Sequence, residues 1–81
     1  MVAVIDTLQV CADCLILIAN GDETGIDERD LKRVRSGVRA LSMDGNYPVS
    51  NGEEFGFNWR ACECCQGLAG DRFGISILGS N

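Results

Sequence analysis

Five cysteines in two groups, one near each end of the chain, constrain its fold more than any other sequence feature. Two residues separate Cys11 from Cys14, and two residues separate Cys62 from Cys65. This spacing lets both sulfurs of a pair reach one ion at ~2.3 Å, and two pairs supply the four thiolates of a tetrahedral structural zinc site. The sequence therefore predicts one zinc ion bound by Cys11, Cys14, Cys62 and Cys65.

Other roles for the cysteines stay open, because the interval between the two pairs exceeds the roughly 15–20 residues of a common zinc ribbon. The odd number of cysteines and an expected cytoplasmic location argue against disulfides. Free cysteines are also buried as small hydrophobic residues. A thioredoxin-like redox pair is the least favoured alternative, because it requires a βαβ unit that this length and order do not supply.

The second cysteine group contains one thiol more than a zinc site requires. We interpret Cys64 as the spare thiol, because pairing Cys62 with Cys65 restores the two-residue spacing. Gly67 follows closely and suits a tight turn in which backbone N–H groups point toward the thiolates. Glu63 lies inside the pair and is expected to point into solvent.

Chain length explains why a metal would be needed. With 81 residues, the chain buries only roughly 60–65% of the surface that its unfolded form exposes, so its core is marginal. A structural zinc contributes on the order of 10–16 kcal/mol in small modules. We therefore expect one zinc-binding domain over residues 1–81.

The longest apolar run, residues 14–19, is far shorter than the ~20 residues of a membrane span, and the N-terminus has no basic region typical of a secretory signal. A cytoplasmic protein without a membrane partner is expected.

Apolar periodicity predicts an α+β fold. Residues 1–6 read as an edge strand. The apolar run that ends at Asn20 fits either a buried strand or a short buried helix, and Asn20-Gly21, a typical helix terminator, favours the helix. A central amphipathic helix begins at Asp27 or Thr24 and ends near Ser42. Its apolar stripe consists of Leu31, Val34, Val38 and Leu41. The polar, turn-rich residues 44–54 are expected to form a connecting loop.

Two alternating runs then predict a C-terminal β-hairpin. In the first run, Phe55, Phe57 and Trp59 alternate with small or polar residues. In the second run, Phe73, Ile75 and Ile77 alternate with Gly74 and Ser76 before Leu78. This pattern indicates half-buried strands, with Trp59 in the core beside the metal and a role as a binding anchor as the alternative. The central helix is expected to pack on this hairpin, and the long tip between the strands is expected to form a zinc knuckle.

Charge limits the functions that are compatible with this chain. The formal net charge is −5, which disfavours nucleic acid as a partner. Histidine is absent, so the commonest general base is missing.

Basic residues nevertheless cluster on the central helix, where Lys32, Arg35 and Arg39 flank the apolar stripe. They form a candidate partner surface, with an ordinary solvated helix face as the alternative. Arg72 follows a glycine and an aspartate, and either it is exposed to a partner or it belongs to a turn.

The stretches "CADCLILIANGD" and "FNWRACECCQGLAGDRF" resemble a group of small uncharacterised proteins of tailed bacteriophages, over residues 11–22 and 55–73. That resemblance implies phage origin, zinc binding and residence in the host cytoplasm, and it implies no reaction. The chain departs from the pattern at Cys64 and in lacking a glycine directly after Cys65.

These observations together predict a phage-encoded zinc-binding protein that acts as a non-enzymatic interaction module. The expected partner is a host or phage macromolecule, with a protein favoured over nucleic acid. An acidic inhibitor that mimics nucleic acid, directed at a host nucleic-acid enzyme or defence system, is the alternative, and a thiol-redox protein is less favoured.

Overall fold

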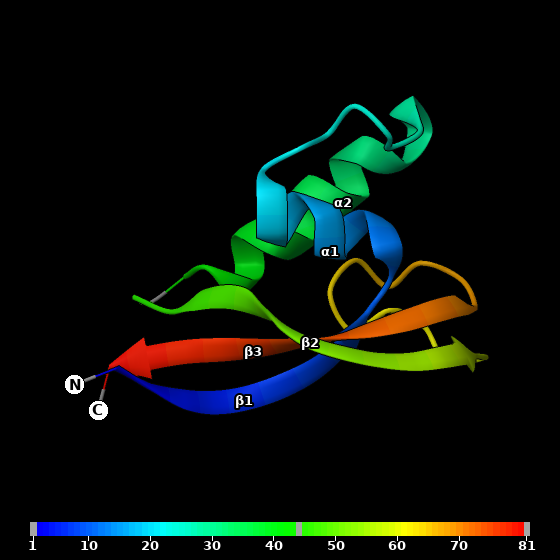
Figure 1. The fold of residues 1–81 in the computed structure, drawn as a ribbon. Helices are drawn as coiled ribbons and strands as arrows, with labels where there is room; N and C mark the ends of the chain where they lie inside the picture. The colour runs from blue at the N-terminus through cyan, green and yellow to red at the C-terminus, as the bar shows by residue number, and fades with distance from the viewer. Residues whose placement is uncertain (1, 44, 81) are drawn as a thin grey trace.

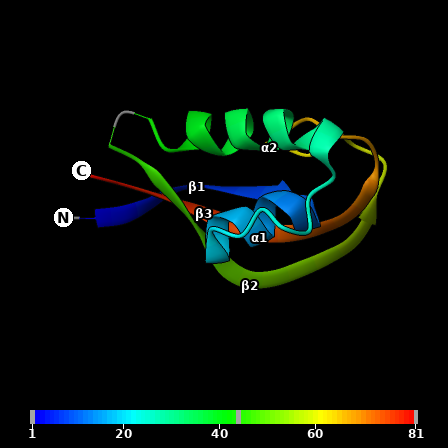
Figure 2. The ribbon, with the colours of Figure 1, turned by 90° about the horizontal axis from the view of Figure 1, so that it is seen from above.

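The computed structural model describes residues 2–43 and 45–80 and has an α+β fold, as predicted. Its elements are β1 (Val2–Val10), α1 (Ala12–Asn20), α2 (Glu28–Leu41), β2 (Tyr47–Asn58) and β3 (Gly70–Ser80). The strands form one antiparallel sheet in the order β1-β3-β2. Both helices lie over the same face of this sheet (Figure 1), with α2 alongside α1 (Figure 2). In the described part of the chain, no helix has the length and apolar character required to cross a bilayer.

Local sequence signals predicted the end of α1 and the beginning of α2. Gly21 adopts a left-handed φ of 65° after α1, and its N–H donates to the Leu17 carbonyl at 2.9 Å. Asp27 caps α2, because its Oδ1 accepts from the Arg29 N–H at 3.0 Å. Thr24 is not a cap, since its own N–H and hydroxyl donate to Asp22.

The first strand lies at an edge of the sheet, as predicted, but it is longer than residues 1–6. It extends to Val10, which is fully buried and pairs with Phe73 of β3. At its other end Val2 pairs with Ser80, so the two ends of the chain lie together (Figure 1). The sheet therefore adds β1 to the predicted hairpin of β2 and β3.

The predicted loop over residues 44–54 is wrong, because β2 already begins at Tyr47. Proline and glycine are tolerated here since β2 is an edge strand and is irregular. Its register against β3 shifts between Ser50 and Glu54 and again between Glu54 and Gly56. Gly52 and Gly56 have positive φ angles of 80° and 72°, so residues typical of turns build the bulges of a strand.

The expected burial of the β2 aromatic residues is also wrong. Phe55 is 45% exposed, Phe57 57% and Trp59 85%, so Trp59 is not part of the core. The bulge that precedes Gly56 breaks the period-two alternation on which the prediction depended. Phe57 and Trp59 contact each other edge-to-face, with ring centroids 4.9 Å apart.

The core lies between the helices and the sheet and is built from small aliphatic side chains and sulfur. Helix α2 contributes Val34, and β3 contributes Ile75 and Ile77. Four of the five cysteines belong to the same buried cluster, and Cys11 packs against it. The cysteine cluster is thus continuous with the hydrophobic core.

Candidate metal centre

Four cysteines from both ends of the chain come together at the edge of this core. Their four sulfur atoms all lie within 4.8 Å of one another. Cys11 Sγ is 3.7 Å from Cys65 Sγ, and Cys62 Sγ is 3.8 Å from Cys14 Sγ. Four sulfurs bound tetrahedrally at ~2.3 Å would be about 3.8 Å apart, so these spacings fit one metal ion. The members are the four predicted from spacing: Cys11, Cys14, Cys62 and Cys65.

The cluster is not a set of disulfides. All five cysteines, each within the described residues, are free thiols. The sulfur separations near 3.7 Å also exceed a disulfide bond of about 2.05 Å by a wide margin. Cys14, Cys62 and Cys65 are buried and Cys11 is half-buried, so a bound ion would be largely shielded from water.

Helix α1 positions the first pair. Cys11 is the N-cap residue with extended backbone angles, and its carbonyl accepts from the Leu15 N–H at 3.0 Å. Cys14 lies in the first turn of the helix, where it is buried. Both sulfurs therefore lie at a helix N-terminus, where the helix dipole stabilises the negative charge of metal-bound thiolates.

Residues 62–67, which we call the knuckle, position the second pair. The N–H groups of Cys64 and Cys65 donate to Cys62 Sγ at 3.3 and 3.5 Å. The Cys62 N–H donates to the Gly67 carbonyl at 3.0 Å and closes the turn. The predicted arrangement, in which backbone N–H groups point toward a thiolate, is present.

One backbone feature of the knuckle is unusual. Gln66 has φ 62°, and among the described residues it is the one non-glycine residue in this left-handed region. It occupies the position directly after Cys65, where the resemblance led us to expect a glycine. Gly67 is in turn confined, because an added Cβ would lie 3.3 Å from Cys65 Sγ.

The thiols of the cluster have very different proton affinities. Hydrogen bonds with the Cys11 and Cys14 side chains, supported by the backbone N–H groups of Cys65 and Cys11, hold the pKa of Cys62 far below its ordinary value. Hydrogen bonds with the side chains of Cys11, Cys62 and Cys64, together with burial, raise the pKa of Cys14. Negative charge therefore accumulates on Cys62, and binding of a metal would release protons from its neighbours.

Cys64 lies outside the four-sulfur group, in agreement with its interpretation as the spare thiol. It is buried all the same, with 9% of its surface exposed. Its backbone is in tight contact with α2, because a Cβ on Gly37 would collide with the Cys64 carbonyl. Sequence reasoning missed this contact, and a glycine in the middle of an amphipathic helix is the signal that could have revealed it.

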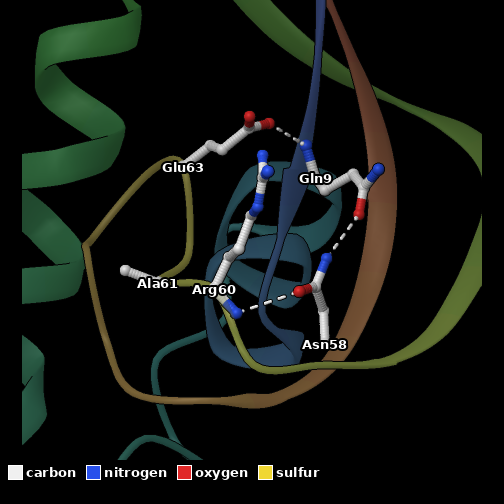
Figure 3. A pocket seen from close by; sticks show the side chains of 5 residues that line it. All are labelled: Gln9, Asn58, Arg60, Ala61 and Glu63. Atoms are coloured by element: carbon white, nitrogen blue, oxygen red, sulfur yellow. Dashed lines mark hydrogen bonds between the residues drawn. The ribbon is translucent and has the colours of Figure 1, made fainter.

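A hydrogen-bond network ties the knuckle to the end of β1 (Figure 3). The Gln9 N–H donates to Glu63 Oε2 at 2.6 Å, and the Glu63 N–H donates to the Gln9 carbonyl at 3.1 Å. Gln9 Oε1 accepts from Asn58 Nδ2 at 3.4 Å, and Asn58 Oδ1 accepts from the Arg60 N–H at 2.9 Å. These residues line a small pocket of about 120 Å³. Glu63 is exposed, as expected, but it also fixes the knuckle against the sheet.

Arg72 is not available to a partner, because only 1% of its surface is exposed. Its Nη2 donates to the Arg60 carbonyl at 2.7 Å and to the Leu68 carbonyl at 3.0 Å. These two carbonyls belong to opposite ends of the loop that carries the knuckle. Arg72 therefore holds the two ends of that loop together from its buried side.

The proposed basic face of α2 is only partly free. Lys32, Arg35 and Arg39 are all exposed. Arg35 forms a bidentate ion pair with Glu23 through Nε at 2.5 Å and Nη2 at 2.6 Å. The hydrogen bonds of this pair lower the pKa of Glu23 and raise that of Arg35. Arg35 thus helps to hold the loop before α2 as well as contributing charge.

Comparison with models of protein families, with curated proteins and with solved structures finds no match to this chain.

Proposed function

We propose that this chain is a small zinc-binding protein in which the metal closes the fold. The observation that carries the proposal is the convergence of four sulfurs, from two distant segments, at spacings that fit one tetrahedral ion. A set of four soft thiolates favours zinc over hard cations such as magnesium and calcium. Four protein ligands leave no open position for substrate, so the role of the ion is structural.

Native mass spectrometry of the chain, purified without added metal, tests the zinc site. We expect one zinc ion per chain. A metal-free chain that unfolds cooperatively at the same temperature with and without added zinc would contradict the proposal.

We further propose that the folded chain is a non-enzymatic interaction module in the host cytoplasm, in keeping with its resemblance to small proteins of tailed phages. Binding requires only a rigid surface, whereas catalysis requires groups with tuned pKa values within reach of a substrate. A protein partner is favoured, because the net charge of −5 opposes binding to phosphates. The alternative of a nucleic-acid mimic has less support, since Glu23, Asp27 and Asp30 each pair with an arginine.

The surface that we assign to the partner is the exposed basic face of α2. Lys32 and Arg39 supply its charge without taking part in the Glu23–Arg35 ion pair. Changing Lys32 and Arg39 to Glu should abolish capture of a protein from a host lysate, while zinc content stays unchanged. Arg60→Glu is a charge-reversal control outside α2, because Arg60 is exposed but belongs to the loop after β2. If capture survives the double change, the binding surface lies elsewhere.

A further inference from the structure

Arg33 of α2 reaches the sulfur cluster from the side of the knuckle. A Cβ built on Gly67 would lie 3.1 Å from Arg33 Nη2 and 3.3 Å from Cys65 Sγ. The guanidinium and the sulfur therefore lie against the same glycine. The other arm of the guanidinium is fixed, because Nη1 donates to Asp30 Oδ1 at 2.9 Å in an ion pair one turn back along the helix.

The electrostatics of Arg33 agree with this geometry. The nearby Cys65 side chain, and then the ion pair with Asp30, raise the pKa of Arg33. The neighbouring Arg29 is a useful contrast. Its side chain is 84% exposed and its Nε is 3.5 Å from an Asp27 carboxylate oxygen, whereas the Arg33 side chain is only 43% exposed.

Backbone donors surround one sulfur of the cluster. The N–H groups of Cys11, Cys64 and Cys65 all converge on Cys62 Sγ, at 3.2, 3.3 and 3.5 Å. Arg33 approaches a different sulfur, that of Cys65. Zinc with four thiolates carries a net charge of about −2, in a chain that is already acidic. A cation beside such a centre stabilises the loaded state more than the empty one, because the thiols of the empty site are partly protonated.

We infer that Arg33 is a charge-compensating residue of the metal centre, which strengthens zinc retention through its position beside the Cys65 sulfur. The inference rests on the proposed zinc site. It assigns to α2, which supplies no ligand, a direct influence on the metal, because α2 holds Arg33 toward the knuckle.

Zinc affinity, measured by competition with a chromophoric chelator at fixed pH and low ionic strength, tests the inference in the full-length chain. Loss of an outer-shell partner typically weakens metal binding by about 10–100-fold. We expect a loss in this range for Arg33→Gln and a change of less than about twofold for Arg29→Gln, which removes the same charge from the same helix. Arg33→Lys keeps the charge but not the planar fork, and it should fall between the two.

Cobalt substitution supplies a readout that a purely structural role would not change. The thiolate-to-cobalt charge-transfer bands should shift in Arg33→Gln, because the cation beside the Cys65 sulfur is lost, and should not shift in Arg29→Gln. Asp30→Asn is a second variant for the case in which Arg33→Gln folds poorly. It leaves the guanidinium free to turn fully to the sulfur, so zinc should bind at least as tightly as in the unaltered chain.

The outcomes separate the two proposals. Equal zinc affinities and identical cobalt spectra for Arg33→Gln and Arg29→Gln would overturn the role of Arg33 and leave the zinc site intact. An unaltered chain that binds no zinc would overturn both. Weaker zinc binding in Asp30→Asn than in the unaltered chain would also count against the role of Arg33, because removal of a carboxylate that competes for the guanidinium should not weaken its interaction with the sulfur.

Discussion

The sulfur of Cys11 lies 3.7 Å from that of Cys65, although the two residues are 54 positions apart in the chain. Cys11 is where β1 passes into α1, and Cys65 is in the loop that leads into β3. An ion shared by these residues would therefore join the beginning of the fold to its last strand. Closing so long a loop restricts the unfolded chain strongly, so the metal is placed where a cross-link has a large effect on stability.

Removal of metal should unfold the protein. The aliphatic part of the core is small, and the cysteines form much of the buried cluster. Without an ion, the four sulfur atoms crowd together in that core with no bond to hold them there. We expect excess chelator to abolish the cooperative thermal transition in circular dichroism, and added zinc to restore it. A chelated chain that keeps its transition would show that the core suffices alone.

The two neighbouring cysteines of the knuckle should behave differently. Cys64→Ser should retain zinc and unfold within about 1 kcal/mol of the unaltered chain, because Cys64 is outside the four-sulfur group. Cys65→Ser should lose the metal and more than about 4 kcal/mol of stability. Zinc content by mass spectrometry and chemical denaturation measure both effects. The reverse result would mean that Cys64, and not Cys65, is the ligand.

The parts of this fold that depend on neighbouring residues were predictable from sequence. Asp27 as a cap, Gly21 as a helix terminator and the two-residue cysteine spacing each act within one turn of chain. The features that depend on distant contacts were not. The sequence placed Arg72 either at a partner surface or in a turn, but it is a buried residue of β3 whose guanidinium donates to the carbonyls of Arg60 and Leu68.

The second strand shows why periodicity failed. Its proline and glycines have the composition of a loop, and only pairing with β3 shows that residues 47–54 belong to an edge strand. The bulge before Gly56 then places the following aromatic residues out of the expected alternation. Phe57 and Trp59 are consequently exposed rather than buried. A bulge is set by the register with a partner strand, which sequence alone does not provide.

Replacing Gln66 by glycine should stabilise the knuckle. A left-handed φ costs a non-glycine residue roughly 1–2 kcal/mol, and the added freedom of glycine in the unfolded chain offsets part of the gain. We expect Gln66→Gly to raise the free energy of unfolding of the zinc-loaded chain by about 0.5–1 kcal/mol, measured by denaturant titration.

Leu68→Gly is the control for Gln66→Gly, because Leu68 is in the same loop and is 93% exposed but is not left-handed. It should lower stability by about 0.4–1 kcal/mol. If both glycine variants are destabilised alike, the backbone of Gln66 is not strained in solution.

Replacing Gly37 by alanine tests the contact between α2 and the knuckle, because helix propensity and packing predict opposite signs. Alanine in the middle of a helix is favoured over glycine by about 0.8–1 kcal/mol. A Cβ at this position, however, would collide with the Cys64 carbonyl and come within 3.0 Å of the Cys65 Cα. Backbone atoms give way less easily than side chains, so packing should dominate. We expect Gly37→Ala to lower the free energy of unfolding by about 1–3 kcal/mol and to weaken zinc binding as well, since the displaced backbone carries Cys65. Ser36→Ala, at an exposed neighbouring position of α2, is the control and should leave both the free energy of unfolding and the zinc affinity nearly unchanged.

A more stable Gly37→Ala chain with unchanged zinc affinity would show that α2 and the knuckle are not in the tight contact described above.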